Sequence, residues 1–228
     1  MKGCKIRVRR IFWTLIISGV ALMVLGGCTK TTETVRPPQV PDGVAGVELS
    51  ASPNNLALTR TDLPAGFQLV AEKSSGPEYV ALYLRPSAAD LDASGGNSLL
   101  GVLTYVAVYT TTADAEHYFS QASFDPAEQS IEDIKPLSST ATDVVTQPFD
   151  GSVQGADASE AYRVTYSLMD RHIFAYSHRI RLANVLAYIA VSAIGNPDEP
   201  QYLLEDVRNI VQRQIDYIAK AALQSAPK

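Results

Sequence analysis

Apolar and polar side chains alternate along several segments of the chain, which is the pattern of half-buried β-strands. The segments richest in Val, Ile, Tyr and Phe are residues 67–72, 79–84, 100–110, 161–168, 171–182 and 185–193, with a weaker one at 143–149. Short polar turns separate several neighbouring segments. We therefore expect a mainly antiparallel sheet.

Spacings of three and four residues between apolar side chains predict helices elsewhere. The clearest is C-terminal and amphipathic, with Leu204, Val207, Val211, Ile215, Ile218 and Ala222 on one face. Further helices are predicted at 112–124 and 126–134, and a short one after Ser52-Pro53. With the helices gathered on one face of the sheet, the predicted fold class is an α+β two-layer sandwich with a long C-terminal amphipathic helix.

The segments 171–182 and 185–193 predict a β-hairpin with Ala183-Asn184 as its two-residue loop. This register places Leu182 opposite Val185 and Tyr176 opposite Val191, so that one face is nearly all apolar and should lie in the core. The other face carries Arg179 opposite Tyr188, with Arg181 beside them.

Two more strands show a similar contrast between aromatic and aliphatic faces. We expect Val80, Leu82 and Leu84 to face the core and the tyrosines between them to face outward. Together with the hairpin, these faces would form a Tyr/Arg platform of Tyr79, Tyr83, Tyr105, Tyr109, Arg179, Arg181 and Tyr188. Aromatic rings beside guanidinium groups suit a glycan, an anionic polymer or another protein. The alternative is an ordinary half-solvated sheet face, where Tyr and Thr are common.

The chain begins with a different pattern. Five basic residues precede position 11, an uncharged apolar run extends from Ile11 to Leu25, and the first acidic residue is Glu33. This order is typical of a secretory signal peptide. The run has 15 residues, fewer than the roughly 20 that span a bilayer. The basic residues would stay inside the cell and the rest of the chain would be exported.

The apolar run ends in Leu25-Gly26-Gly27-Cys28, which resembles the lipobox of bacterial lipoproteins. The resemblance implies that the chain is cleaved before Cys28 and that the Cys28 thiol carries diacylglycerol. An uncleaved N-terminal anchor is the alternative. We therefore expect a signal peptide at 1–27, a lipidated cysteine and flexible tether at 28–50, and a single domain at 51–228, held on the extracytoplasmic side of a bacterial cell membrane.

Removal of the signal peptide changes the charge and the cysteine count. The whole chain has 228 residues, 19 Lys and Arg, 24 Asp and Glu, and a net charge of −5. Without the five basic residues at the N-terminus the charge becomes 14 − 24 = −10. Cys4 is lost as well, so that Cys28 is the only cysteine left. These values exclude a disulfide-stapled domain, a cysteine-ligated metal site and a generally basic nucleic-acid binder.

Three short segments of the predicted domain are similar to sensor-like lipoprotein domains of bacterial envelopes: Asp62-Leu63-Pro64-Ala65-Gly66-Phe67, Thr112–Ala115, and Arg181-Leu182-Ala183-Asn184-Val185. The resemblance implies the α+β fold class. Related domains often have Gly at the position of Ala183.

One segment of the sequence partly matches a calcium-binding loop. Asp90, Asp92 and Ser94 match the first, third and fifth ligands of a calcium loop, but the twelfth position is Gly101 instead of Glu. His172 and His178 would lie about 20 Å apart on one strand, too far to share an ion.

The sequence contains no Gly-x-Ser-x-Gly or P-loop motif. We therefore predict no cofactor and no enzymatic activity, and instead a non-catalytic binding or interaction module whose partner is an envelope protein or an anionic glycan. The alternatives are an envelope hydrolase with carboxylates from separate segments and a carrier of a small or lipid-like ligand.

Overall fold

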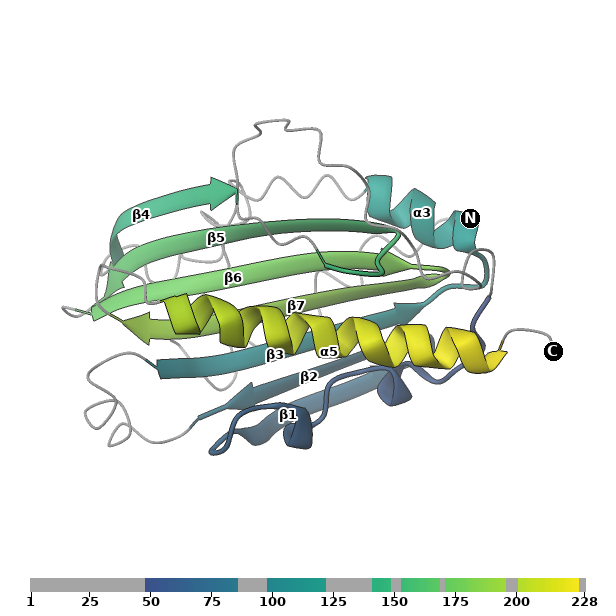
Figure 1. The fold of residues 1–228 in the computed structure, drawn as a ribbon, viewed down its shortest axis with the longest axis horizontal. Helices are drawn as coiled ribbons and strands as arrows, with labels where there is room; N and C mark the ends of the chain where they lie inside the picture. Colours follow the sequence, from purple (N-terminus) through teal and green to yellow (C-terminus); the bar gives the residue numbers. More distant parts are fainter. Residues whose placement is uncertain are drawn as a thin grey trace.

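The computed structural model describes residues 48–85, 98–121, 141–148, 153–168, 171–195 and 201–225 (Figure 1). The strands are β1 (Gln68–Ser75), β2 (Glu78–Leu84), β3 (Ser98–Val108), β4 (Ala141–Pro148), β5 (Ala158–Leu168), β6 (Arg171–Leu182) and β7 (Val185–Gly195). The helices are the 3-10 turns η1 (Pro53–Asn55) and η2 (Arg60–Asp62), and the α-helices α3 (Thr112–Gln121) and α5 (Gln201–Ser225). The predicted helix at 126–134 lies outside the described residues.

The seven strands form one antiparallel sheet in the order β1-β2-β3-β7-β6-β5-β4, so β7 is the central strand. Helix α5 crosses one face of this sheet and contacts β6 and β7 (Figure 1). The predicted α+β sandwich with a long C-terminal helix is confirmed. Each predicted strand is present and differs from its observed bounds by a few residues at most.

The predicted register of the β6–β7 hairpin is also confirmed. Leu182 pairs with Val185, and Tyr176 pairs with Val191. The loop residue Ala183 has a φ of 52°, in the left-handed region that favours glycine.

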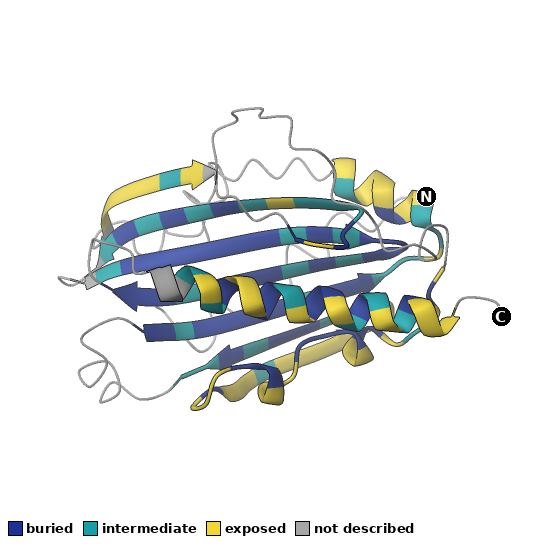
Figure 2. Ribbon diagram, viewed as in Figure 1, coloured by how far each residue is buried: buried dark blue, intermediate teal, exposed yellow. Residues whose placement is uncertain are grey.

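The main core lies between α5 and the sheet. Val207, Val211, Ile215 and Ile218 of α5 are at most 1% exposed and meet the apolar face of the hairpin. Figure 2 shows the result as alternating buried and exposed turns along α5 above strands that are buried at their centres. The hydrophobic periodicity of the helix therefore predicted its buried face correctly.

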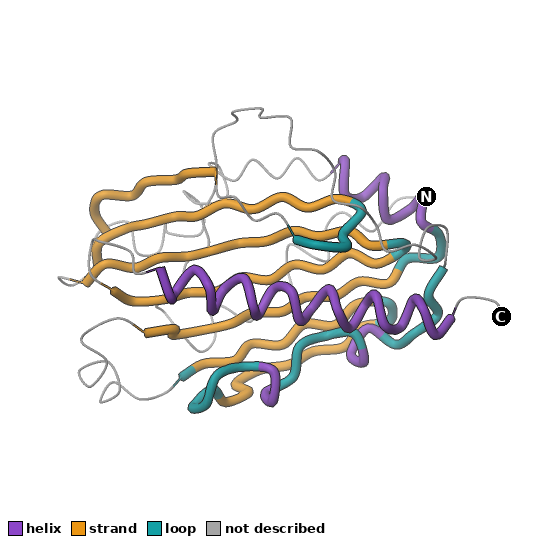
Figure 3. The backbone as a smooth tube through the Cα atoms, viewed as in Figure 1, coloured by secondary structure: helices purple, strands orange, loops and turns teal. Residues whose placement is uncertain are grey.

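A second part of this core comes from residues 49–67, which we call the N-terminal strap. It consists of loop with the two short turns η1 and η2 (Figure 3), and η1 contacts β2 and β3. Leu56, Leu58 and Phe67 of the strap are each 1% exposed. The strap thus covers the part of the sheet that α5 leaves open.

The opposite face of the sheet, which we call the back face, is also partly buried. Two smaller apolar clusters lie there, one around Val80, Leu103 and Ala190 and the other around Val164 and Tyr166. Helix α3 contacts this face as well, because its Phe119 packs on Arg179 of β6. The two α-helices thus contact opposite faces of the sheet, whereas the sequence predicted helices on one face. Both faces of the sheet therefore have buried side chains.

The two edge strands each contain a β-bulge. In β1 the register shifts between Leu69 and Ala71, and in β4 it shifts between Thr142 and Val145. Val70 and Val145 are exposed at these positions. Bulges at sheet edges interrupt the row of free backbone groups to which another strand would add.

Candidate functional site

The structure divides the seven residues of the predicted Tyr/Arg platform between the two faces of the sheet. Tyr79 and Tyr83 point toward α5 and the strap, whereas Val80 and Leu82 lie on the back face. The expectation that Tyr79 and Tyr83 share a surface with the other platform residues is therefore wrong. The strap explains the difference, because Tyr83 is 4% exposed and its hydroxyl donates to the Leu58 carbonyl at 2.9 Å.

Tyr79 is half-buried on the same side as Tyr83. Its hydroxyl donates to the carboxylate of Glu72 at 2.9 Å. Burial, and then the bond to Glu72, raises the pKa of Tyr79, so this phenol stays protonated at neutral pH. Both tyrosines of β2 are thus structural contacts of the α5 side.

Three other platform residues do lie together on the back face. Strand pairing places Tyr105 of β3 opposite Tyr188 of β7, and Tyr188 opposite Arg179 of β6. All three are half-buried. We call Tyr105, Tyr188 and Arg179 the Tyr/Arg row. It is the part of the predicted platform that the fold assembles.

Neighbouring groups hold each member of the row. The Tyr188 hydroxyl donates to Ser177 Oγ at 3.1 Å. Arg179 lies 3.2 Å from the Glu160 carboxylate, its guanidinium sits 4.3 Å from the centre of the Phe119 ring, and it donates to the Phe119 carbonyl. Arg179 thereby fastens α3 to the sheet.

The third member of the row, Tyr105, forms a hydrogen bond with the carboxyl group of Glu78. This bond and the charge of Lys73 lower the pKa of Glu78, but burial raises it by more, so that the pKa is raised overall.

Arg181 and Tyr109 lie near the row but have structural partners of their own. Arg181 forms an ion pair with Asp157 at 3.2 Å, and the same carboxylate accepts a hydrogen bond from the Ala183 amide at 2.8 Å. Tyr109 stacks on Tyr118 of α3, with ring centres 4.8 Å apart. These contacts stabilise the hairpin loop and hold α3 against the end of β3.

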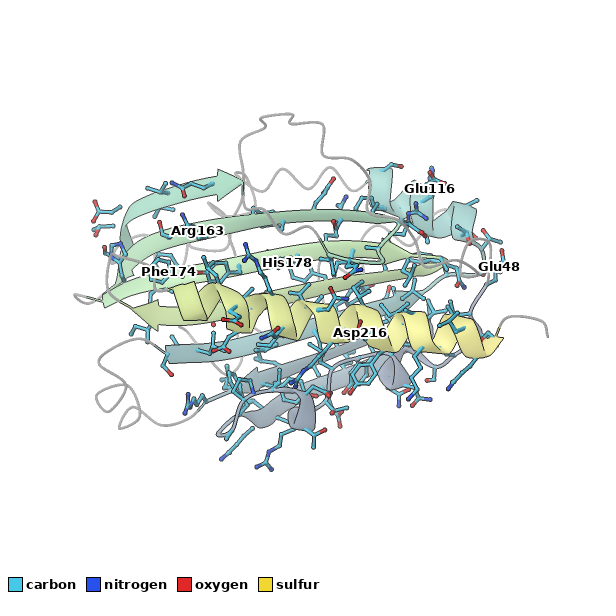
Figure 4. The ribbon with its side chains drawn as sticks, viewed as in Figure 1. Glu48, Glu116, Arg163, Phe174, His178 and Asp216 are labelled. Carbon is cyan, nitrogen blue, oxygen red and sulfur yellow. The ribbon has the colours of Figure 1, made fainter. Side chains whose placement is uncertain are left out.

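The histidines do not form a metal site. His178 is 1% exposed on the α5 side of β6 (Figure 4). Burial, together with the positive charge of nearby Arg208, lowers the pKa of His178 to about 4. His172 packs edge-on against Phe174. Among the residues that the structure describes, no three His, Cys, Asp or Glu side chains come close enough to hold a metal ion.

Two predicted sites lie outside the described residues. These are Cys28 with its lipobox and the calcium-loop candidate Asp90, Asp92 and Ser94. They stay predictions. Within the described part of the chain, no helix is long and apolar enough to cross a bilayer.

Three buried polar side chains that the sequence interpretation missed join distant parts of the fold. Asn184, in the β6–β7 loop, and Gln214, on α5, are each 0% exposed. Asn184 bonds to Leu49 in both directions, as the amide of Leu49 donates to Oδ1 at 2.7 Å and Nδ2 donates to its carbonyl at 2.9 Å. A signal for Gln214 existed, since it interrupts the apolar face of the C-terminal helix.

Gln214 holds the middle of the strap. Its Oε1 accepts from the Leu58 amide at 3.2 Å and from the Thr104 hydroxyl at 2.9 Å, and its Nε2 donates to the Leu56 carbonyl. The strap pairs with no strand in this region, and a side-chain amide supplies the partners instead.

The third of these side chains is Asp62, at the end of η2. It accepts hydrogen bonds from the amide and hydroxyl of Thr59, and from the hydroxyl of Tyr217 on α5. The bond from the Thr59 amide is part of a capping box between Thr59 and Asp62. Burial raises the pKa of Asp62, but these hydrogen bonds and the charge of Arg213 outweigh burial, so the pKa is lowered overall. The ionised carboxylate therefore fastens the strap to the helix.

Comparison with known proteins gives no family. No family model matches the chain, and no curated protein matches it. Similar solved structures include an uncharacterised protein of Mycobacterium smegmatis, with 11% identity, 74% of this chain and 84% of that chain covered, and a TM-score of 0.33. The Ran-binding protein Mog1p of Saccharomyces cerevisiae has 12% identity, covers 72% and 84%, and has a TM-score of 0.30. TM-scores this low support no conclusion about function.

Proposed function

We propose that the chain is a lipid-anchored lipoprotein on the extracytoplasmic side of a bacterial cell membrane, with a non-catalytic binding module as its folded domain. The observation that carries this proposal is Leu25-Gly26-Gly27-Cys28, placed directly after a basic segment and an apolar run. The two acyl chains of a diacylglyceryl group anchor a protein stably, whereas one chain binds a membrane only marginally.

Contacts of the carboxylates favour binding over hydrolysis. Asp62, Asp157 and Glu160 each bond to groups that hold the fold together. A glycoside hydrolase of the common kind needs two carboxylates that face each other across the substrate. The Tyr/Arg row is instead the surface on which we place contacts with an envelope protein or an anionic glycan, through the rings of Tyr105 and Tyr188.

The chain offers a matched pair of cysteines to test the anchor. We expect Cys28→Ala to abolish incorporation of radioactive palmitate and to release the protein from the membrane fraction or leave it unprocessed. The control Cys4→Ala changes the other cysteine, within the signal peptide, and should incorporate palmitate like the wild type. Globomycin, which inhibits lipoprotein signal peptidase, should cause accumulation of the precursor. Labelling of the Cys28→Ala protein at the wild-type level would contradict the proposal.

A further inference from the structure

The chain enters the folded domain at a buried asparagine. Asn184 Oδ1 accepts from the Leu49 amide at 2.7 Å, and Asn184 Nδ2 donates to the Leu49 carbonyl at 2.9 Å. These are the two bonds that a neighbouring strand would make, so the side-chain amide replaces a strand. Leu49 is itself only 3% exposed. Residue 49 is therefore held by both its backbone and its side chain.

The loop that carries Asn184 is fixed from other sides. Asn184 also donates to the Tyr109 carbonyl, and its own carbonyl accepts from the Tyr109 amide at 2.8 Å. The adjacent Ala183 amide donates to Asp157 at 2.8 Å. Hairpin loops usually lie at the surface, yet Asn184 is 0% exposed. We call the bonds between Asn184 and Leu49 the clamp.

The clamp lies at one end of the sheet. The same end includes the β1–β2 turn, since Val108 donates to the Pro77 carbonyl at 2.9 Å, and it includes the start of β5, since Ala158 pairs with Arg181. Glu48 and the C-terminal end of α5 also lie there (Figures 1 and 4). We call this end the clamp pole. The other end, where Gln68 pairs with Leu84, is the far pole.

The clamp is made to the loop of the central hairpin. Strand β7 is the fourth of seven in the sheet, so a pull on residue 49 acts near the middle of the clamp pole. Nineteen residues, 29–47, lie between Cys28 and Glu48, and the flexible tether expected from the sequence would span about 25 Å on average. A tether this short, leaving from one pole, brings that pole nearer to its anchored end than the opposite pole.

We propose that Asn184 fixes the end of the tether to the folded domain, so that the lipid anchor holds the domain by its clamp pole and the far pole faces away from the membrane. This inference rests on the proposed lipid anchor. Release of the clamp would add residues 49–52 to the tether, because the next segment, η1 (Pro53–Asn55), contacts β2 and β3 and its Pro53 is buried. The domain would then lie farther from the membrane and turn more freely.

The clamp itself can be tested without a membrane. In the processed lipoprotein, which begins at Cys28 and is kept in detergent, the Leu49 amide should exchange slowly with deuterium. In Asn184→Ala, and in Asn184→Asp, which cannot donate to the Leu49 carbonyl, the exchange at Leu49 should be faster by at least about tenfold. The Ile189 amide in the core of β7 reports whether each variant is folded. Unchanged exchange at Leu49 in both variants would overturn the inference.

Orientation can be measured with two probes on one strand. Ser75 lies at the clamp pole and Gln68 at the far pole, both exposed, and their separation along β1 is about 23 Å. Because lipidated Cys28 has no free thiol, Ser75→Cys and Gln68→Cys each give one labelling site. Energy transfer to acceptor lipids in vesicles should be stronger from residue 75 than from residue 68.

The same probes in an Asn184→Ala background show whether the clamp, and not another contact, orients the domain on the membrane. The difference between residues 75 and 68 should shrink in this background. Equal energy transfer from both probes in the protein with native Asn184, or a difference that Asn184→Ala leaves unchanged, would overturn the proposal that Asn184 orients the domain. Failure of the protein to float with the vesicles would instead overturn the lipid anchor, while the exchange experiment would still test the clamp.

Discussion

At the scale of single residues, a few buried polar side chains connect segments that no strand pairing joins. Asn184 and Gln214 hold the backbone of the strap at two points, and Asp62 holds it at a third. A buried amide or carboxylate is costly unless its hydrogen bonds are made. These residues therefore fix the path of the strap more narrowly than apolar packing would.

His178 makes folding sensitive to acid. Its pKa is about 4 in the folded protein and about 6.5 in the unfolded chain. The unfolded state therefore binds more protons between these values, and the free energy of unfolding should fall by about 3 kcal/mol as the pH drops from 7 to below 4. Asp62 adds to the loss below its unfolded pKa, since its folded pKa is the lower one.

Urea unfolding at several pH values measures this effect. In His178→Gln the contribution of the histidine should disappear, so the variant should lose about 3 kcal/mol less than the wild type between pH 7 and pH 4. His117→Gln, which changes an exposed histidine on α3, should lose as much as the wild type. An NMR titration that gave His178 a pKa near 6.5 would contradict the expectation.

At the scale of elements, the sheet is covered on its α5 side by two unlike parts. Helix α5 lies over β6 and β7, while the strap contacts β2 and β3. The strap has little regular structure, and its contribution comes from apolar side chains such as Leu56 and Leu58 and from the bonds to α5. The two parts therefore stabilise each other through Gln214, Arg213 and Tyr217.

Gln214→Leu should remove the hydrogen bonds by which α5 holds the strap. The substitution keeps the apolar volume but leaves the Leu58 amide, the Leu56 carbonyl and the Thr104 hydroxyl without their partner. We expect a loss of about 3 kcal/mol in the free energy of unfolding. Gln224→Leu on an exposed position of the same helix should change stability by less than about 0.5 kcal/mol. A loss for Gln214→Leu as small as that of the control would contradict this account.

The elements predicted correctly are those whose sequence signal lies in neighbouring residues. The β6–β7 register follows from a two-residue loop and an apolar face, both within 25 residues of sequence. The buried face of α5 follows from its periodicity. The faces of β2 were inverted because aliphatic and aromatic side chains are both good core residues, and the burial of Tyr83 depends on a strap that pairs with no strand.

At the scale of the whole molecule, the domain has no covalent cross-link. The chain has two cysteines, Cys4 and Cys28. The first would leave with the signal peptide and the second would carry lipid. The residues from 48 onward contain none. Stability thus comes from packing on both faces of the sheet and from buried hydrogen bonds.

Thermal unfolding with and without reductant tests whether the domain is stable without a disulfide. The processed lipoprotein in detergent should have the same Tm in the presence and absence of dithiothreitol, because a disulfide would need a second free thiol. Mass spectrometry of the N-terminal peptide provides the control, since it reports whether Cys28 carries lipid. A Tm that falls on reduction would contradict the expectation.

The candidate site shows the same division between local and distant information. Composition and motifs predicted the lipid anchor and the tyrosines and arginines of the sheet. Pairing of β3 with β7 and of β7 with β6 then brought Tyr105, Tyr188 and Arg179 into one row. Arg179 further meets Phe119, 60 residues away in sequence. No local pattern contains such a contact.

The sequence alone determined the order of the strands and helices along the chain, the register of the central hairpin and the buried face of α5, because each depends on the spacing of neighbouring residues. It also contains the signal and lipobox pattern on which the proposed anchor rests. Only the tertiary structure decided that Tyr79 and Tyr83 face α5 and the strap, and that Asn184 and Gln214 hold the strap. These depend on which distant segment covers a face, and burial by a distant segment leaves no periodic trace in the residues that it buries.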